Sequence, residues 1–181
     1  MMSQKDTMTN DLKFEAMKTI FDQNYQLISL ADNKATAILT VNGILLTVVL
    51  AMVGLLGGFF IIENKLDVAV IVLFGLYVLS CLVSIIFSIL TISPFQKTGI
   101  PDKRHIFYYV NILEHETKEE YNKGLTKVLD DFSLLQKEFS DQIYSISKVN
   151  QRKYKYVKWC IWTLLVSLII IGGFLTLTIL R

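Results

Sequence analysis

The sequence contains few of the residues that interrupt helices, form disulfides or bind metals. Its 181 residues include two prolines, two cysteines and two histidines. Pro94 and Pro101 lie close together, so the rest of the chain has no proline to end a helix. Cys81 and Cys160 fall within or beside apolar runs, where a thiol behaves as a small hydrophobic group. We therefore expect neither a disulfide framework nor a cysteine-based metal site.

Charged residues are almost absent from three windows, residues 35–62, 68–93 and 159–180. Each window can cross a bilayer as a helix, which takes roughly 20 apolar residues. The alternative interpretation, buried core helices of a soluble protein, fails because the remaining residues are too few to enclose three helices that are apolar on all sides. The sequence therefore predicts an all-α membrane protein with three transmembrane helices.

Lysine and arginine are distributed unevenly around these windows. Four precede the first window and twelve lie in residues 94–158, whereas the loop at 63–67 contains only Lys65. Because positive charge accumulates in cytosolic loops, we expect a cytosolic N-terminus and an external C-terminus. The expected segments are a cytosolic amphipathic helix (1–34), a first transmembrane helix (35–62), an external turn (63–67), a second transmembrane helix (68–93), a cytosolic helical sensing region (94–158) and a third transmembrane helix (159–180). The polar start of the chain predicts no cleaved signal peptide.

Two stretches next to the windows have the apolar spacing of amphipathic helices. The first consists of Phe14, Met17, Phe21, Ile28 and Ala31, widened by Ile20, Leu27 and Leu30. The second consists of Val128, Phe132, Leu135, Phe139, Ile143, Ile146 and Val149. No proline or glycine separates either stretch from the following window, so each is predicted to continue into the membrane as one helix. The mixed charges of the first polar face favour packing on other helices, with binding to the lipid surface as the alternative.

The segment between these stretches contains a helix start. Thr117 and Glu120 have the spacing of a capping box, so a helix is expected to begin there. The preceding apolar run, residues 106–113, fits either a strand or a short buried helix, and the helical context favours the helix. Residues 148–158 are rich in Lys, Arg and Tyr, which is typical of a membrane-interface belt, with anionic-ligand binding as the alternative.

Polar residues at the start of the first window form a candidate functional site. They are Asp32, Asn33, Lys34 and Asn42. An amide inside a membrane is expected to face protein or water and to form a hydrogen bond across helices. Asp32 and Asn42 share one helix face, so they could line a seam that acts either as interhelical glue or as part of a pore. Glycines at 54, 57, 58, 172 and 173 would allow close helix contacts and suit a homo-oligomer.

Residues suited to catalysis or metal binding do not occur in a recognised arrangement. His105 and His115 are far apart in sequence and lack a metal-ligand spacing. The adjacent carboxylates Asp130 and Asp131 point in different directions on a helix and make a poor acid–base pair. We expect no enzyme activity, no metal and no cofactor. The net charge of +2 is too small to indicate a nucleic-acid polymer as partner.

Five segments are informative through their order and spacing. They are ADNKA (31–35), TVNGILL (40–46), an IFYY run, TKEEY (117–121) and DQIYSISKVNQRKYKYV (141–157). Over most of its length the chain thereby resembles the transmembrane effectors of Pycsar, a bacterial antiphage system that signals with cyclic pyrimidine mononucleotides. The resemblance implies a bacterial inner-membrane protein that responds to a cyclic nucleotide and disrupts the membrane, so that the infected cell stops growing or dies.

A cyclic nucleotide would need a cation for its phosphate and would favour an aromatic face for its base. The residues that supply these groups close together are Lys103, Arg104, Tyr108, Tyr109 and Tyr121, which could instead be aromatic core and loop charges. The leading hypothesis is a ligand-activated, membrane-disrupting effector whose partners are the bilayer, a cyclic mononucleotide and further copies of itself. The alternatives are a non-conducting scaffold that recruits a cytosolic partner and a constitutive small channel, for which one Asn gives little support.

Overall fold

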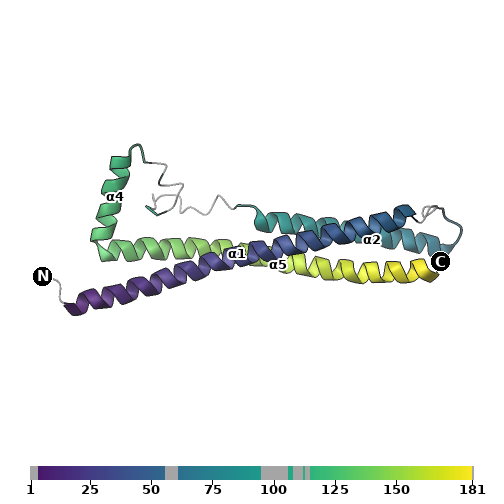
Figure 1. Ribbon diagram of the computed structural model, residues 1–181, viewed down its shortest axis with the longest axis horizontal. Helices are drawn as coiled ribbons and strands as arrows, with labels where there is room; N and C mark the ends of the chain where they lie inside the picture. Colours follow the sequence, from purple (N-terminus) through teal and green to yellow (C-terminus); the bar gives the residue numbers. More distant parts are fainter. Residues whose placement is uncertain (1–3, 56–60, 95–105, 108–111, 113–114, 181) are drawn as a thin grey trace. The chain divides into compact units, whose positions relative to one another are not determined.

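Four helices account for most of the chain in the computed structural model, which describes residues 4–55, 61–94, 106–107, 112 and 115–180. They are α1 (Gln4–Leu55), α2 (Lys65–Ile92), α4 (Lys118–Asp130) and α5 (Phe132–Leu180) (Figure 1). The described residues contain no strand. Three of these helices, α1, α2 and α5, are long and apolar enough to cross a membrane. The predicted all-α membrane fold is confirmed.

The chain forms two compact units, and α1 and α5 contribute to both. Unit 1 combines residues 1–29 with 94–151, and unit 2 combines residues 30–93 with 152–181. The expected continuity of the amphipathic stretches with the apolar windows is therefore correct, because no break divides α1 at residue 35 or α5 at residue 159.

Unit 2 is a bundle of the apolar parts of α1, α2 and α5, which lie alongside one another (Figure 1). Buried positions recur at alternating intervals of three and four residues, the repeat of left-handed helix packing. On α1 they are Ala31, Ala35, Ile38, Asn42, Val49 and Val53, and on α2 they are Asp67, Val70, Tyr77, Cys81, Ser84, Ser88 and Thr91. On α5 they are Lys153, Val157, Cys160, Ser167 and Phe174. The bundle thus has a continuous but partly polar core.

The outer surface of unit 2 is apolar. Ile44, Leu79 and Ile169 are 59%, 58% and 75% exposed, one on each helix. Large apolar side chains cover the outside while hydroxyls, an amide and a lysine lie inside, which is the distribution expected when lipid surrounds a bundle.

The second transmembrane helix begins at Lys65, three residues before the apolar window. Its start is fixed by Asp67, which is only 2% exposed. The Asp67 carboxylate accepts hydrogen bonds from the backbone amides of Glu63 and Asn64, at 2.8 and 2.7 Å. These contacts satisfy amides that a helix start leaves without an intrahelical partner.

Unit 1 has an aromatic core around Phe139 of α5. The Phe139 ring lies 5.6 Å from Phe14, 5.9 Å from Phe21 and 5.7 Å from Phe107, measured between ring centroids. The first stretch of α1 therefore packs on a helix, as the mixed charges of its polar face favoured. Its predicted width is wrong, because Ile20, Leu27 and Leu30 are 46%, 42% and 45% exposed.

The helix start predicted at residue 117 is confirmed. The Thr117 side chain accepts a hydrogen bond from the Glu120 amide at 3.2 Å, and α4 begins at Lys118. The Glu120 carboxylate accepts a hydrogen bond from the amide of Glu116 at 3.1 Å. Of the run at 106–113, only Ile106, Phe107 and Ile112 are described, so the choice between strand and helix lies outside the described residues.

The chain turns sharply between α4 and α5 (Figure 1). Asp131 causes this turn, since it leaves the helical conformation at φ −116° and ψ 106°. Its carboxylate accepts from the backbone amide of Ser133 at 2.8 Å and from the Ser133 hydroxyl at 2.7 Å. Asp131 is therefore the cap of α5, a role the sequence analysis did not assign to it.

Candidate functional site

Polar side chains in the interior of unit 2 form one line along the bundle, which we name the polar seam. It consists of Asp32 and Asn42 on α1, Ser84, Ser88 and Thr91 on α2, and Lys153 and Cys160 on α5, all buried except the half-buried Asp32. All three helices contribute, since the heptad repeat brings these positions to the bundle axis. From Asp32 to Asn42 the seam covers about 15 Å of helix at 1.5 Å per residue.

Lys153 lies at the Asp32 end of the seam and is only 4% exposed. Its ammonium group donates to the Asp32 carboxylate and to the backbone carbonyl of Thr91, the latter at 2.8 Å. One cation thus joins all three helices. Because α2 ends at Ile92, the Thr91 carbonyl belongs to the negative end of the α2 dipole, which favours a cation there.

Side chains of α2 and α5 continue the seam inward. The Ser88 hydroxyl lies 3.6 Å from the sulfur of Cys160, and the Thr91 hydroxyl lies 4.0 Å from the same sulfur. Ser84 donates to the Cys160 carbonyl at 3.4 Å. These small polar groups form weak, long contacts, so they hold the helices together less firmly than the ion pair does.

Asn42 ends the seam seven residues after the start of α1's apolar window at residue 35, and it is fully buried. Its amide nitrogen donates to the Ser84 hydroxyl at 2.8 Å and to the Ile38 carbonyl at 3.1 Å. The predicted hydrogen bond across helices is therefore confirmed. The Asn42 carbonyl oxygen has no hydrogen-bond partner among the described residues, although it is buried. A buried acceptor without a donor costs about 1–3 kcal/mol.

Beyond Asn42 the core of the bundle becomes largely apolar. Val49, Val53, Val70 and Phe174 are each at most 9% exposed and belong to one packed cluster. Unit 2 thus has a polar end next to Asp32 and a mostly apolar remainder, in which the hydroxyls of Tyr77 and Ser167 are also buried. The packed apolar side chains of this remainder would oppose the passage of water and ions.

The predicted seam residues separate into two groups. Asp32 and Asn42 lie in the seam, whereas Asn33 and Lys34 are exposed. The Lys34 ammonium lies 5.9 Å from the centre of the Tyr154 ring, on the outside of the bundle. The sequence analysis missed Lys153 because a lysine between Arg152 and Tyr154 resembled part of the interfacial belt. The seven-residue intervals from Lys153 to Cys160 and from Ser84 to Thr91 could have indicated their shared face.

Of the predicted ligand residues, only Tyr121 is among the described residues. It packs against the core of unit 1, and its ring centroid lies 5.6 Å from that of His115. Lys103, Arg104, Tyr108 and Tyr109 lie outside the described residues. The nucleotide site therefore stays a prediction.

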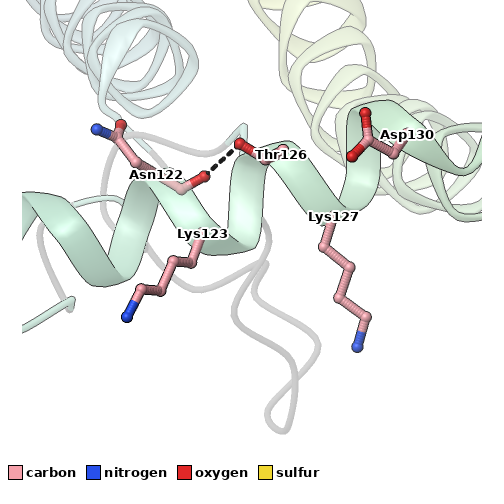
Figure 2. A pocket seen from close by; sticks show the side chains of 5 residues that line it. All are labelled: Asn122, Lys123, Thr126, Lys127 and Asp130. Atoms are coloured by element: carbon pink, nitrogen blue, oxygen red, sulfur yellow. Dashed lines mark hydrogen bonds between the residues drawn. The ribbon is translucent and has the colours of Figure 1, made fainter.

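A shallow depression of about 590 Å³ lies on α4 in unit 1 (Figure 2). It is lined by Asn122, Lys123, Thr126, Lys127 and Asp130. The ammonium groups of Lys123 and Lys127 extend to the same side of the helix, which would attract an anion (Figure 2). Its lysines are exposed and no buried donor lines it, so this surface is a solvated helix face and makes no built binding site.

One histidine lies next to a carboxylate near the start of α4. His115 Nδ1 lies 3.7 Å from a Glu120 carboxylate oxygen. The described part of the chain contains no group of three or more His, Cys, Asp or Glu that could hold a metal ion. Asp130 ends α4 and Asp131 caps α5, so these two carboxylates have separate structural positions.

The fold and the seam define a class: a multi-pass helical membrane protein whose core is partly polar. The family model of the Pycsar effector protein domain matches residues 16–180. The chain belongs to this family, and it is an antiphage defence effector that acts within cyclic-nucleotide signalling at a membrane. No curated protein and no solved structure gives a significant match.

Proposed function

We propose that the protein permeabilises the inner membrane of an infected bacterium when it binds a cyclic mononucleotide, with a cyclic pyrimidine mononucleotide as the expected ligand. The observation that carries this proposal is the polar seam, which runs from Asp32 to Asn42 into the bundle and stops at an apolar cluster. A polar path closed by an apolar constriction is a known arrangement for gating by dewetting. The activity requires no catalytic step.

The route from ligand to membrane follows from the helices. Unit 1 contains the region 94–151, where the nucleotide-binding residues are predicted, and α5 runs without a break from unit 1 into unit 2. Ligand-driven rotation or displacement of α5 would move Lys153 and Cys160, which form one wall of the seam. We place unit 1 in the cytosol, where a nucleotide made on infection is available, and this placement agrees with the positive-inside distribution of Lys and Arg.

The experiment follows membrane potential in bacteria that co-express the chain with a cyclic pyrimidine nucleotide synthase. We expect depolarisation within minutes of synthase induction, because an open seam would conduct ions down the membrane potential. A catalytically inactive synthase provides the matched control. Unchanged potential, with the protein in the membrane and the nucleotide confirmed in extracts, would exclude the proposal.

Self-association belongs to the same proposal. Gly54 and Gly172 have no atom within 4 Å of the position of an added Cβ, so their helix faces are open to lipid or to another copy. We infer that close helix contacts at these faces assemble a homo-oligomer. Chemical cross-linking in native membranes tests this inference, and an exclusively monomeric product would contradict it.

A non-conducting scaffold is the second candidate function. It is favoured by the exposed apolar side chains on the unit 1 part of α1, where Leu12 is 66% and Ile20 is 46% exposed. Such side chains suit a partner surface. The scaffold predicts no depolarisation with any nucleotide and stable co-purification of another protein, whereas the effector predicts depolarisation.

A further inference from the structure

The oxygen atoms around Lys153 are those that a hard monovalent cation would use. A carboxylate oxygen of Asp32 and the carbonyl oxygen of Thr91 accept from the same ammonium group. Na⁺ and K⁺ are bound in proteins by carboxylate and backbone carbonyl oxygens, and the C-terminal end of α2 adds a partial negative charge. The ammonium of Lys153 therefore lies where a metal cation would bind if the lysine were absent.

Further oxygen atoms follow inward along the seam from this position. The hydroxyls of Ser88 and Ser84 follow on α2, and both side chains are fully buried. The seam then reaches the Asn42 carbonyl oxygen, which is buried and has no donor among the described residues. An acceptor without a donor is the group that can coordinate a dehydrated cation without first losing a hydrogen bond.

We propose that Lys153 is a tethered cation that blocks a monovalent-cation site at the Asp32 end of the seam. When Lys153 leaves, K⁺ or Na⁺ takes its place against Asp32 and Thr91 and moves inward along the seam. This proposal rests on the proposed permeabilising function and names the ions and the residue that excludes them.

The chemistry of the lysine side chain suits this role. A lysine ammonium on a four-carbon stem can withdraw from a buried partner and extend to the membrane interface, since its apolar stem tolerates lipid. Its neighbours on α5, Arg152 and Lys155, are exposed, so rotation of the helix would carry Lys153 toward that surface. The negative charge of Asp32 would then remain at the mouth and raise the local cation concentration.

The experiment measures K⁺ efflux from proteoliposomes that contain the full chain, without nucleotide. The variant Lys153→Met keeps the size of the side chain and removes its cation. Its K⁺ leak should be at least about tenfold faster than that of the wild type, because K⁺ would then be concentrated in the seam next to the apolar cluster. The cluster remains packed, so this leak should stay well below that of the nucleotide-opened protein. The variant Lys153→Arg keeps a cation and should stay closed. The matched control is Lys155→Met, which removes an exposed lysine on the same turn and should also stay closed.

A second variant separates the cation site from general loosening of the bundle. Adding Asp32→Asn to Lys153→Met removes the charge that attracts cations, so the K⁺ leak should fall back toward the wild-type rate. A bundle that merely loosened would leak equally in both variants and would pass chloride as readily as K⁺, which would overturn the proposal. If Lys153→Met is not recovered in the membrane, Lys153→Gln replaces it in the experiment. The glutamine amide can still donate to Asp32, but it carries no charge.

The outcomes also distinguish this proposal from the proposed function. The Lys153→Met protein could be helical and leak no K⁺ while the wild type in the same preparation opens with nucleotide. This result would reject the tethered cation and leave the proposed function intact. A leaking Lys153→Met protein whose wild type never opens with any cyclic mononucleotide would support the cation site and reject the proposed ligand activation.

Discussion

At the residue scale, the buried groups of the seam are a poor way to stabilise a bundle. The ion pair between Lys153 and Asp32 must offset the loss of solvation of both charges, and apolar residues of similar volume often give equal or greater stability. A buried lysine or asparagine at a core position of a helical bundle instead fixes which residues face one another. The seam therefore favours one arrangement of α1, α2 and α5 at a cost in stability, which is consistent with the proposed ligand-driven change of arrangement.

The first prediction concerns the amide at the inner end of the seam. Asn42→Leu should abolish nucleotide-dependent depolarisation, since it replaces the amide at the inner end of the seam by an apolar side chain. Its stability should not fall by more than about 0.6 kcal/mol, the value of a membrane hydrogen bond, because removal of a buried oxygen without a donor offsets this loss. Thermal unfolding in detergent and membrane potential in cells check the two parts.

Ser84→Ala is the matched control for this variant. It removes the hydroxyl that accepts from Asn42 at 2.8 Å but leaves the amide in place. It should weaken the bundle by about 1 kcal/mol. Depolarisation should be reduced but not abolished, because the Asn42 amide remains in the seam. If Asn42→Leu destabilises the assembly strongly and still conducts when assembled, Asn42 is interhelical glue and has no part in a pore.

The buried position of Asn42 could be predicted from the sequence, whereas that of Lys153 could not. A single amide in a long apolar window has few ways to be satisfied, so its burial and its contact across helices followed from the energetics of the membrane alone. Lys153 lies in a run of basic and aromatic residues. In such a run the local sequence predicts a position at the membrane interface for every lysine alike. Only the rotation of α5 relative to its neighbours distinguishes Lys153 from Lys155, and that rotation depends on contacts distant in sequence.

At the scale of elements, the packing of α1 against α5 in unit 1 depends on Phe139. Its ring contacts Phe14, Phe21 and Phe107. Phe139→Ala should destabilise unit 1 by about 3 kcal/mol, the lower end of the range for Phe→Ala, because the ring is only partly buried. Hydrogen exchange should accelerate in residues 9–29 of α1. Tyr144→Ala, at a side chain that is 58% exposed, should leave these amides protected.

The start of α5 gives a prediction about pH. Hydrogen bonds from the hydroxyl and the amide of Ser133 hold the pKa of the Asp131 carboxyl below its ordinary value of 3.8. A lowered folded pKa means that the cap stabilises the protein fully above 3.8 and loses this effect as the pH falls through the folded value. The stability difference between wild type and Asp131→Ala should therefore be largest at neutral pH and shrink in acid. Denaturant unfolding of both proteins at neutral pH and in acid measures this stability difference. A difference that is as large in acid as at neutral pH contradicts the role of the charged cap.

Helix boundaries were predictable to different degrees, for local reasons. The start of α4 at Lys118 follows from the Thr117 hydroxyl, whose partner lies three residues along the chain. The break at Asp131 contains neither proline nor glycine, and the apolar periodicity continues across it from Val128 to Phe132 and Leu135. Asp131 ends α4 because its side chain caps α5. Whether this break is more stable than one continuous helix depends on how α4 packs against Ile106, and the sequence does not show that contact.

At the scale of the whole molecule, the three spans were the most predictable feature, since their length and lack of charge leave few other structures. The nucleotide site was the least predictable, because it depends on side chains from a connecting segment whose conformation is not set by periodicity. Family membership supplies the signalling context that the physical pattern alone does not provide.

The orientation of the chain can be tested by labelling introduced cysteines, because the two native cysteines are expected not to react. Cys81 and Cys160 are both free and buried, so a membrane-impermeant maleimide should not label the wild type in intact spheroplasts. Lys65→Cys, in the predicted external turn, should be labelled in intact spheroplasts, because its position is exposed at the start of α2. Lys123→Cys, exposed on α4, should be labelled only after the membrane is opened, since the excess of Lys and Arg predicts a cytosolic position for this region. The reverse labelling pattern would place unit 1 outside the cell, where a nucleotide made during infection could not reach it, and would remove the cytosolic ligand from the proposed activation.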